Sequence, residues 1–319
     1  MKRKELNLRK VVVIGDGMVG SSIAYTLLLQ SAATNVVLID VNVDKTIGDA
    51  LDMNHAVSLS SPKEIKAGDY SDIVDAHIII ITAGANQKPG ETRIDLLNKN
   101  KAILHSIADQ MLPYLNKDSI ILMVTNPVDI LTYYMSTILP LPHEQIIGSG
   151  TVLDSGRLKY LISEDTGIDP RNIHAYVIGE HGDSELAAFS VTSIAGISIL
   201  DFCKSCGKCK KYIHLEKYKQ MEKEVVNSAY EIINRKGSTY YGIAAATKKI
   251  VDAIINDTHS VLTVSSYIKS ALDGQISDVY LSVPSVVSER GATKTLWPEY
   301  SLEEKNKLID SANKLKQYY

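Results

Sequence analysis

The sequence predicts an α/β protein in which a doubly wound parallel sheet, residues 1–149, is followed by an α+β domain, residues 150–319. Two observations lead to this prediction. Short runs rich in Val and Ile alternate with helical patterns in the first half, whereas the second half is less regular. The length of 319 residues also fits two domains, given a typical domain of roughly 150 residues.

In the first half, each apolar run is short enough for a buried strand. The predicted strands are Val11–Ile14, Val36–Ile39, His77–Thr82, Ile120–Val124 and Ile146–Ile147. The third contains four consecutive isoleucines, as expected of a strand that is covered on both faces. Helical patterns lie between the strands: one starts at about Ser21, one runs through Leu51, and one covers Ile94–Met111.

The second half combines helices with strands of an antiparallel sheet. Helices are predicted at Val152–Ser163, along the face formed by Tyr218, Met221, Val225, Ala229 and Ile232, from about Gly242, and around Leu308–Leu315. Strands are predicted at Ile173–Gly179, Val261–Ile268 and Val279–Val287, the last two in one antiparallel sheet.

Composition excludes several classes of protein. The 34 Lys and Arg against 37 Asp and Glu leave no basic excess for nucleic acid. No stretch reaches the roughly 20 apolar residues of a membrane span, and the basic start Met1-Lys2-Arg3-Lys4 lacks the apolar core of a signal peptide. Three cysteines do not suggest a disulfide framework, so we expect a cytoplasmic protein.

Gly15, Gly17 and Gly20 form G-x-G-x-x-G between a predicted strand and a predicted helix. This spacing permits a tight turn, close approach of backbone to a pyrophosphate, and contact between helix and strand. The helix N-terminus then offers N–H groups to the phosphates. Asp40 ends the next strand, where a carboxylate can bind a ribose 2′-hydroxyl and repel the extra phosphate of NADP. The sequence therefore predicts a Rossmann-type domain that binds NAD; an ordinary strand-end Asp40 is the alternative.

Two further segments suggest chemistry. Gly179–Asp183 places His181 between small residues just after a strand, and histidine exchanges protons near neutral pH. A surface histidine is the alternative. The polar stretch Thr82–Arg93 follows a strand at the edge where parallel sheets bind ligands, and it could close over a substrate. A surface loop without function is the alternative there.

Taken together, these motifs resemble the bacterial-type NAD-dependent L-lactate dehydrogenases of the lactate and malate dehydrogenase family. The resemblance covers nearly the whole chain from about Lys10. Six motifs carry it in order: Gly15–Ser22, Thr82–Arg93, Thr125–Asp129, Gly148–Arg157, Gly179–Asp183 and Ser238–Gly242. It implies a homotetramer that reduces pyruvate with NADH and so regenerates NAD in fermentation.

The resemblance assigns roles that also make physical sense. His181 protonates the carbonyl oxygen of a 2-oxo acid, and Asp154 orients the imidazole and raises its pKa. Arg157 binds the substrate carboxylate through its planar fork, which lysine cannot reproduce. Arg93 polarises the carbonyl. An i,i+3 ion pair on a helix surface is the alternative for Asp154 and Arg157.

Gln87 determines the expected substrate. In the family, a glutamine here resembles lactate dehydrogenases and an arginine resembles malate dehydrogenases, because arginine pairs with the second carboxylate of oxaloacetate. Gln87 therefore favours pyruvate. A malate or branched 2-hydroxy-acid dehydrogenase is the nearest rival, and a non-catalytic NAD-binding protein is a rival of another class.

The resemblance also indicates residues that line the pocket and an activator site. Asn126 hydrogen-bonds near the substrate oxygen, and Thr239 and Ile243 line the substrate and nicotinamide pocket. The remaining NAD-lining positions are Val19, Lys45, Tyr70, Gly84, Ala85, Ser106, Val124 and Ser149. Lys159 and His174 match the fructose 1,6-bisphosphate site, with lysine in the arginine position, so we expect activation with weaker affinity. A non-allosteric enzyme is the alternative.

All three cysteines, Cys203, Cys206 and Cys209, lie in C-x-x-C-x-x-C near His214. Three thiols and an imidazole could bind zinc. The segment is rich in lysine, however, and a solvated surface stretch with free thiols is the favoured interpretation. No metal is therefore expected.

Overall fold

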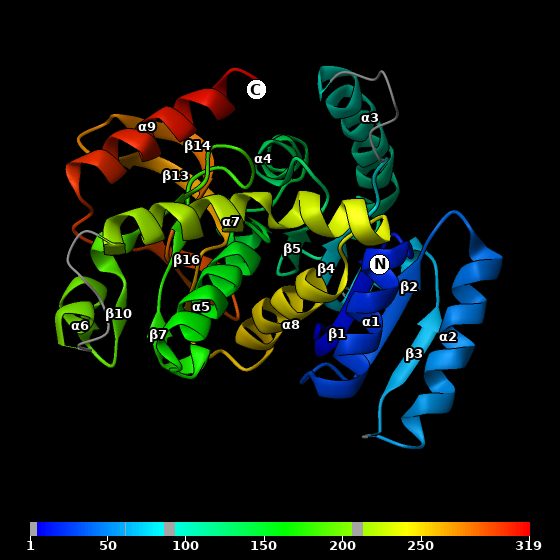
Figure 1. Cartoon of the computed structure of the whole chain (residues 1–319). Coiled ribbons are helices and arrows are strands. Elements are labelled where there is room, and N and C mark those ends of the chain that lie inside the picture. Colours follow the sequence, from blue (N-terminus) through cyan, green and yellow to red (C-terminus); the bar gives the residue numbers. More distant parts are fainter. Residues whose placement is uncertain (1–4, 61, 86–92, 206–212) are drawn as a thin grey trace.

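The computed structural model describes residues 5–60, 62–85, 93–205 and 213–319. An eight-stranded sheet lies at its centre, in the order β14-β13-β6-β5-β4-β1-β2-β3 (Figure 1). All pairs among β1 to β6 are parallel. The chain builds outward from β1 to β3, returns to β4 beside β1, and then builds outward to β6. The predicted doubly wound parallel sheet is thus confirmed.

The first half contains β1 (Asn7–Ile14), α1 (Met18–Gln30), β2 (Asn35–Ile39), α2 (Val43–Val57), β3 (Glu64–Ala67), β4 (Ala76–Ile81), α3 (Arg93–Met111), β5 (Ile120–Met123), α4 (Val128–Ile138) and β6 (Ile146–Gly148). Its 3-10 helices are η1 (Tyr70–Asp75) and η2 (His143–Gln145). The predicted strands all exist. β3 and α4 are elements that the sequence pattern did not predict. α1 begins at Met18, three residues before the predicted start.

The second half contains α5 (Val152–Thr166), η3 (Pro170–Asn172), β7 (Ile173–His174), β8 (Val177–Ile178), β9 (Leu186–Ala187), η4 (Phe189–Val191), β10 (Ser193–Ile194), β11 (Ile197–Ser198) and α6 (Ile199–Ser205). These are followed by α7 (Ile213–Lys236), α8 (Tyr241–Ile255), β12 (Ser260–Leu262), β13 (Ser265–Ala271), β14 (Ile276–Ser282), β15 (Ser285–Ser288), β16 (Gly291–Thr295) and α9 (Leu302–Lys316).

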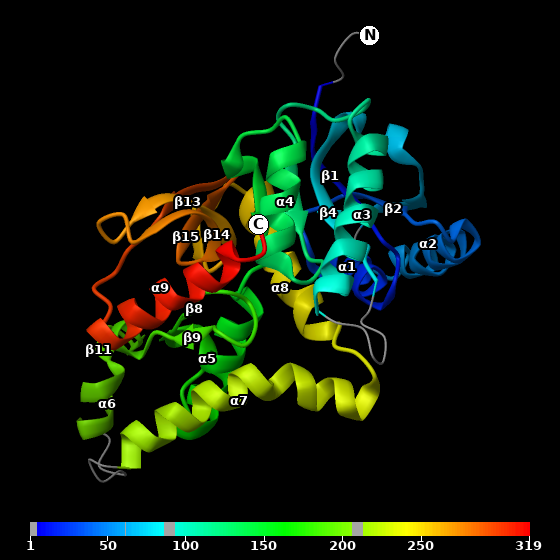
Figure 2. The same cartoon turned by 90° about the horizontal axis from the view of Figure 1, so that it is seen from above.

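Helices cover both faces of the sheet. Successive residues of β1 point to opposite faces, so Val11 and Val13 pack with α1, α2 and α8, whereas Val12 and Ile14 pack with α3, α4 and α9. All four β1 residues are fully or almost fully buried, as the continuous apolar runs predict. A third core joins α5 to α7, the long helix that extends along one side of the molecule in Figure 2.

The two antiparallel strands of the second half differ from the prediction. The predicted strand Val261–Ile268 is broken into β12 and β13, because the carbonyl of Thr263 turns to accept the N–H of Thr151 at 3.0 Å. Pro284 cannot donate to a ladder, and it separates β14 from β15. β13 and β14 pair with each other and extend the parallel sheet through β6, while β12, β15 and β16 form a separate sheet.

The predicted strand Ile173–Gly179 is also two short strands. It changes partners along its length, since β7 pairs with β10 and β8 pairs with β9. Within the described part of the chain, no helix is both long and apolar enough to cross a membrane.

Candidate active site

The first part of the site lies where β1 and β4 run side by side. The chain leaves these strands in opposite directions, which makes their carboxyl ends the switch point where doubly wound sheets bind ligands. The two loops that leave them are joined: the Thr82 N–H donates to the Ile14 carbonyl at 2.9 Å, and the Thr82 hydroxyl donates to the Gly15 carbonyl at 2.7 Å. These hydrogen bonds hold the two loops together at the base of the expected ligand crevice.

The glycines of G-x-G-x-x-G are required for different reasons. Gly15 has φ +103°, and a Cβ there would lie 2.5 Å from the Ala83 nitrogen. At Gly20, a Cβ would lie 1.8 Å from the Gly15 carbonyl oxygen. These two glycines bring helix, loop and strand together, as the sequence predicts.

Gly17 differs, because a Cβ there would meet no atom within 4 Å. No described neighbour therefore excludes a side chain at this position. The open space at Gly17 fits the close approach of a ligand to the backbone. It is the N-cap of α1, and the first helical hydrogen bond runs from the Ser21 N–H to its carbonyl. The N–H groups of the first turn therefore have no partner inside the helix and can bind an anion.

Asp40 is held at the end of β2. Its Oδ2 accepts the Asp16 N–H at 2.6 Å, and its Oδ1 accepts the Asn42 N–H at 2.9 Å. Lys45 Nζ lies 3.2 Å from Asp16 Oδ2 and 2.5 Å from Asp49 Oδ2. Burial raises the pKa of Asp16 to about 6, although Lys45 opposes this shift. The open space at Gly17, the free N–H groups and the fixed Asp40 together fit a dinucleotide.

Most other predicted NAD-lining residues share one edge of the sheet. Tyr70 follows β3, Gly84 and Ala85 follow β4, and Val124 and Ser149 follow β5 and β6. Val19, Lys45, Ser106 and Ile243 lie on α1, α2, α3 and α8. Asn100, which the sequence analysis did not single out, ties two of these loops: its side chain accepts the Ala85 N–H at 2.8 Å and donates to the Asn126 carbonyl at 3.0 Å.

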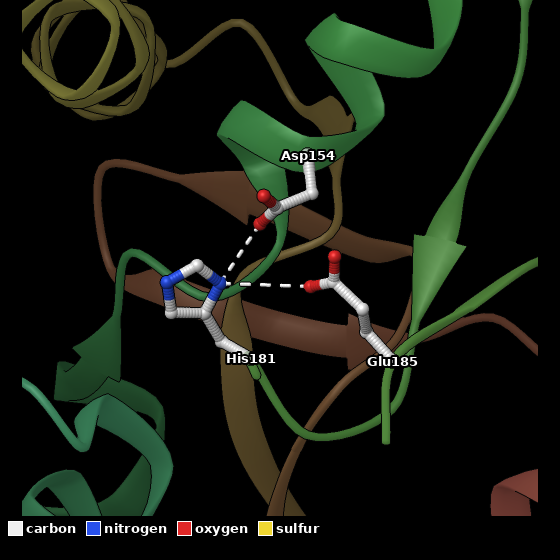
Figure 3. A group of neighbouring side chains, drawn as sticks. All are labelled: Asp154, His181 and Glu185. Carbon is white, nitrogen blue, oxygen red and sulfur yellow. Dashed lines mark hydrogen bonds and ion pairs between the residues drawn. The ribbon is translucent and has the colours of Figure 1, made fainter. Parts of the chain in front are cut away.

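The second part of the site surrounds His181. Its Nδ1 lies 2.8 Å from Asp154 Oδ2, on α5, as Figure 3 shows. The Asp154 side chain is only 1% exposed, whereas the His181 side chain is 24% exposed. Burial alone would lower the pKa of His181, but the charge of Asp154 and its hydrogen bond raise that pKa well above 6.5. Asp154 therefore favours the protonated form of the imidazole.

Arg157 lies on the other side of Asp154. Its Nη1 donates to Asp154 Oδ1 at 2.6 Å; Asp154 is buried and Arg157 is partly buried. Burial would raise the pKa of Asp154, but His181 and Arg157 outweigh this effect and lower it. The i,i+3 ion pair predicted as the alternative therefore exists, but its carboxylate is buried and is shared with His181.

Two carboxyl groups near His181 were not predicted. Asp129, on α4, accepts the His181 backbone N–H at 2.7 Å and the Ser265 hydroxyl at 2.5 Å. Glu185 Oε2 lies 3.7 Å from His181 Nδ1, beyond hydrogen-bond distance. Asp129 belongs to the motif Thr125–Asp129, which was a usable signal, whereas Glu185 lies just past Gly179–Asp183 and gave none.

His181, Asp154 and Glu185 place one ligand atom each within 4.8 Å of one another, a spacing that a metal ion would also need. Asp154, however, is already paired with Arg157 and with the His181 N–H. A protonated imidazole and a bound guanidinium are unfavourable neighbours for a cation, so this cluster is better suited to holding a proton.

His181 opens onto a cavity of about 290 Å³. The cavity is lined by Leu96, Leu97, Asn126, Pro127, Ile130, Glu180, His181, Gly182, Asp183, Tyr230 and Tyr318. His181 and Asn126 thus come together as predicted. Thr239, between α7 and α8, is half-buried and not among the described lining residues. Arg93 begins α3, while its side chain and Gln87 lie outside the described residues.

The predicted activator residues lie on neighbouring elements of the second half. Lys159, on α5, lines a cavity of about 300 Å³ together with Lys249. Burial, together with the charge of Lys249, lowers the pKa of Lys159. His174 is exposed on β7 and is not among the described residues that line this cavity. The side chains of Cys203, Cys206, Cys209 and His214 lie outside the described part of the chain.

Comparison with protein families finds two adjacent matches. The model "lactate/malate dehydrogenase, NAD binding domain" matches residues 9–148, and the model "lactate/malate dehydrogenase, alpha/beta C-terminal domain" matches residues 151–319.

Similar proteins come from several bacteria. An L-lactate dehydrogenase of Thermoanaerobacterium saccharolyticum is 49% identical over 309 residues, which cover 96% of each chain. An L-lactate dehydrogenase of Thermoanaerobacter pseudethanolicus is 52% identical over 300 residues, 93% of this chain and 94% of the relative.

Solved structures give the same result. A lactate dehydrogenase from a Medee basin deep-sea metagenome library superposes with a TM-score of 0.92 at 38% identity, covering 97% of both chains. The minor L-lactate dehydrogenase of Enterococcus mundtii, in a ligand-bound form, superposes with a TM-score of 0.91 at 38% identity, also over 97% of both chains.

Proposed function

Because the chain belongs to the lactate/malate dehydrogenase family, we propose that it is an NAD-dependent L-lactate dehydrogenase that interconverts pyruvate and L-lactate. The observation that carries the proposal is the His181–Asp154 pair, 2.8 Å apart, which opens onto a cavity lined by Asn126. Relatives that are 49% and 52% identical over nearly the whole chain bear this name.

The residues of the crevice fit NAD. The first turn of α1 and Gly17 would hold the pyrophosphate, and Asp40 would bind the adenosine ribose. When bound, NAD supplies or accepts the hydride at C2 of the substrate. Asp40 favours NAD over NADP because its carboxylate repels a 2′-phosphate.

His181 supplies the proton. Asp154 accepts the Nδ1–H, so the other ring nitrogen, Nε2, is the one that donates to the substrate oxygen. In pyruvate reduction, C2 gains the hydride and the oxygen gains the His181 proton, which yields lactate and leaves a neutral imidazole. In lactate oxidation the same nitrogen takes the hydroxyl proton back.

The remaining residues orient the substrate. Arg157 binds the substrate carboxylate, and its ion pair with Asp154 fixes the guanidinium before the substrate arrives. Arg93 and Asn126 polarise the carbonyl, and Thr239 lines the pocket. Gln87 leaves no positive charge for a second carboxylate, which favours pyruvate.

The first test is NADH oxidation with pyruvate and with oxaloacetate, side by side. We expect a strong preference for pyruvate. Faster turnover of oxaloacetate would contradict the interpretation of Gln87, and turnover only of larger 2-oxo acids would indicate a branched-substrate enzyme. A protein that binds NADH but reduces no 2-oxo acid would be a non-catalytic member of the family.

We also propose that fructose 1,6-bisphosphate activates the enzyme, with Lys159 and His174 as phosphate ligands. The two lysines at the 300 Å³ cavity support an anion site there. The same assay with and without the sugar phosphate tests this, and an unchanged rate at every pyruvate concentration would overturn it.

The proposal also covers the oligomeric state, the cellular setting and the domain boundary of the enzyme. It would work as a homotetramer, in cytoplasmic fermentation, with the domain boundary between residues 149 and 150. Analytical ultracentrifugation tests the first, and a species of single-chain mass at assay concentration would contradict it.

A further inference from the structure

Glu185 is a buried acidic residue that the proposed reaction does not use. Its side chain is 4% exposed, and it immediately precedes β9. Within the described residues, its Oε2 is buried and has no hydrogen-bond partner. A buried carboxyl oxygen without such a partner is costly to the fold, so its position requires an explanation.

The nearest positive group is the catalytic imidazole. Glu185 Oε2 lies 3.7 Å from His181 Nδ1, the same nitrogen that Asp154 contacts at 2.8 Å. Figure 3 shows the two carboxyls approaching this nitrogen from different segments, Asp154 from α5 and Glu185 from the loop residue just before β9. The Nδ1–H can donate to only one of them, and the shorter distance assigns it to Asp154.

We propose that Glu185 is a positioning residue for His181, whose carboxyl sets the pH range over which the imidazole stays protonated and reduction of pyruvate can proceed. This inference rests on the proposed function. Glu185 acts through electrostatic attraction across 3.7 Å, and it does not contact the reacting atoms.

The surrounding charges make the two groups titrate together. Asp154 and Arg157 face the pair from α5, Asp129 lies on α4, and Glu180 lies on the same loop as His181. Glu222, on α7, lines a small gap beside Glu185 but has its own partner in Lys307. When Asp154, Glu185, Arg157 and His181 are all ionised, the two negative charges cancel the two positive ones. When His181 releases its proton, these four groups carry a net charge of −1, and a proton on Glu185 returns the net charge to zero.

The direction of the pKa of Glu185 agrees with this arrangement. Burial raises it to about 7, against the opposing effect of His181. Glu185 therefore changes charge in the pH range where the enzyme would work. An ionised Glu185 stabilises the imidazolium, and a protonated one does not.

The test compares Glu185→Gln, which keeps the shape and removes the charge, with Glu222→Gln as a matched control. Glu222 is a half-buried carboxylate of the same region that pairs with Lys307 at 3.7 Å. The readout is the pH dependence of kcat/KM for pyruvate with NADH. We expect the midpoint of the alkaline decline to fall by about one pH unit in Glu185→Gln, and to stay at the wild-type value in Glu222→Gln.

A second readout needs no turnover. Diethyl pyrocarbonate reacts with the neutral form of a histidine ring and not with the protonated form. Its rate at His181, followed by peptide mass spectrometry, therefore reports the protonation of that ring. We expect its pH midpoint to fall by the same amount in Glu185→Gln. If wild-type protein turned over no pyruvate, the proposed function would fail while this measurement still tested Glu185.

Glu185→Asp keeps the charge but moves it away from Nδ1, so we expect a smaller shift in the same direction. This variant carries the test if the Gln variant does not fold. Midpoints equal to wild type in both readouts would overturn the proposal. So would a loss of activity that is uniform across pH, because that result would mean a structural role only.

Discussion

Replacing Asp129 by asparagine should change how the stability of the protein depends on pH. The Asp129 side chain is buried and accepts the His181 N–H at 2.7 Å. Burial raises the pKa of this carboxyl from 3.8 to about 6, although the hydrogen bond from Ser265 opposes the shift. A difference of about 2 units corresponds to about 3 kcal/mol.

The sign follows from the raised pKa. The folded state binds the Asp129 proton more tightly than the unfolded state does. This contribution is therefore complete below about pH 4 and lost as the pH rises through about 6. Asparagine does not titrate. The unfolding free energy of Asp129→Asn relative to wild type should thus rise by about 3 kcal/mol between about pH 4 and pH 7.

Below pH 4 the variant should be the less stable protein. The amide N–H₂ of the introduced asparagine would face a donor, His181 N–H or Ser265 O–H, and losing one such hydrogen bond costs about 1–2 kcal/mol. Urea unfolding of both proteins at a series of pH values measures the difference. Asp118→Asn, which removes an exposed carboxylate, is the control and should follow the wild-type curve. Parallel curves for Asp129→Asn and wild type would refute the reasoning.

Four further substitutions test the proposed roles. Asp154→Asn removes the negative charge beside His181 Nδ1 and should lower kcat/KM for pyruvate about 100-fold, which corresponds to a barrier about 3 kcal/mol higher; a loss below tenfold would contradict the role of Asp154. Arg157→Lys should raise KM for pyruvate at least about tenfold, because lysine lacks the planar fork, and an unchanged KM would exclude carboxylate binding there. Asp40→Ser should raise the NADPH-to-NADH ratio of kcat/KM about tenfold, whereas a constant ratio would remove Asp40 from cofactor selection. Lys159→Arg should lower the fructose 1,6-bisphosphate concentration needed for half-activation, and no response in either protein would end the activator proposal.

The parallel half of the fold was predictable because its signal is local. A strand segment covered on both faces is apolar at successive positions, so β1, β2, β4 and β5 each contain an unbroken apolar run rich in Val, Ile or Leu. β3 (Glu64–Ala67) is an edge strand with a single buried residue, and an edge strand carries no such run. Its existence depends on pairing with β2, which a local pattern does not contain.

The partners of the antiparallel strands were not predictable for a related reason. The apolar residues of Val261–Ile268 predict a strand but do not reveal which strand it pairs with. The break at Thr263 arises from a hydrogen bond to Thr151, more than 100 residues earlier in the chain. Such a break can be found only once α5 and the sheet are in contact.

In the site, too, local patterns were predictable from the sequence and long-range contacts were not. The glycine spacing and Asp40 follow from the geometry of any strand-turn-helix unit, so they were predictable from residue types. The pairing of His181 with Asp154 joins residues 27 positions apart and came from the family resemblance. For Arg157, the sequence leaves open a substrate ligand or an ion pair with Asp154. In the structure the ion pair holds only Nη1 of the guanidinium, so the two roles are compatible.

Three acidic residues act on different parts of His181. Asp129 accepts the backbone N–H from α4, Asp154 accepts the Nδ1–H from α5, and Glu185 adds a charge from the end of the loop before β9. All three act on the backbone or on the Nδ1 side of the ring, and Figure 3 shows the second ring nitrogen turned away from Asp154 and Glu185. A carboxylate on that second side would compete with the substrate oxygen for the proton. The placement of Asp154 and Glu185 on the Nδ1 side leaves Nε2 unpaired with either of them and available for proton transfer, while the charge of Asp154 favours the protonated imidazole.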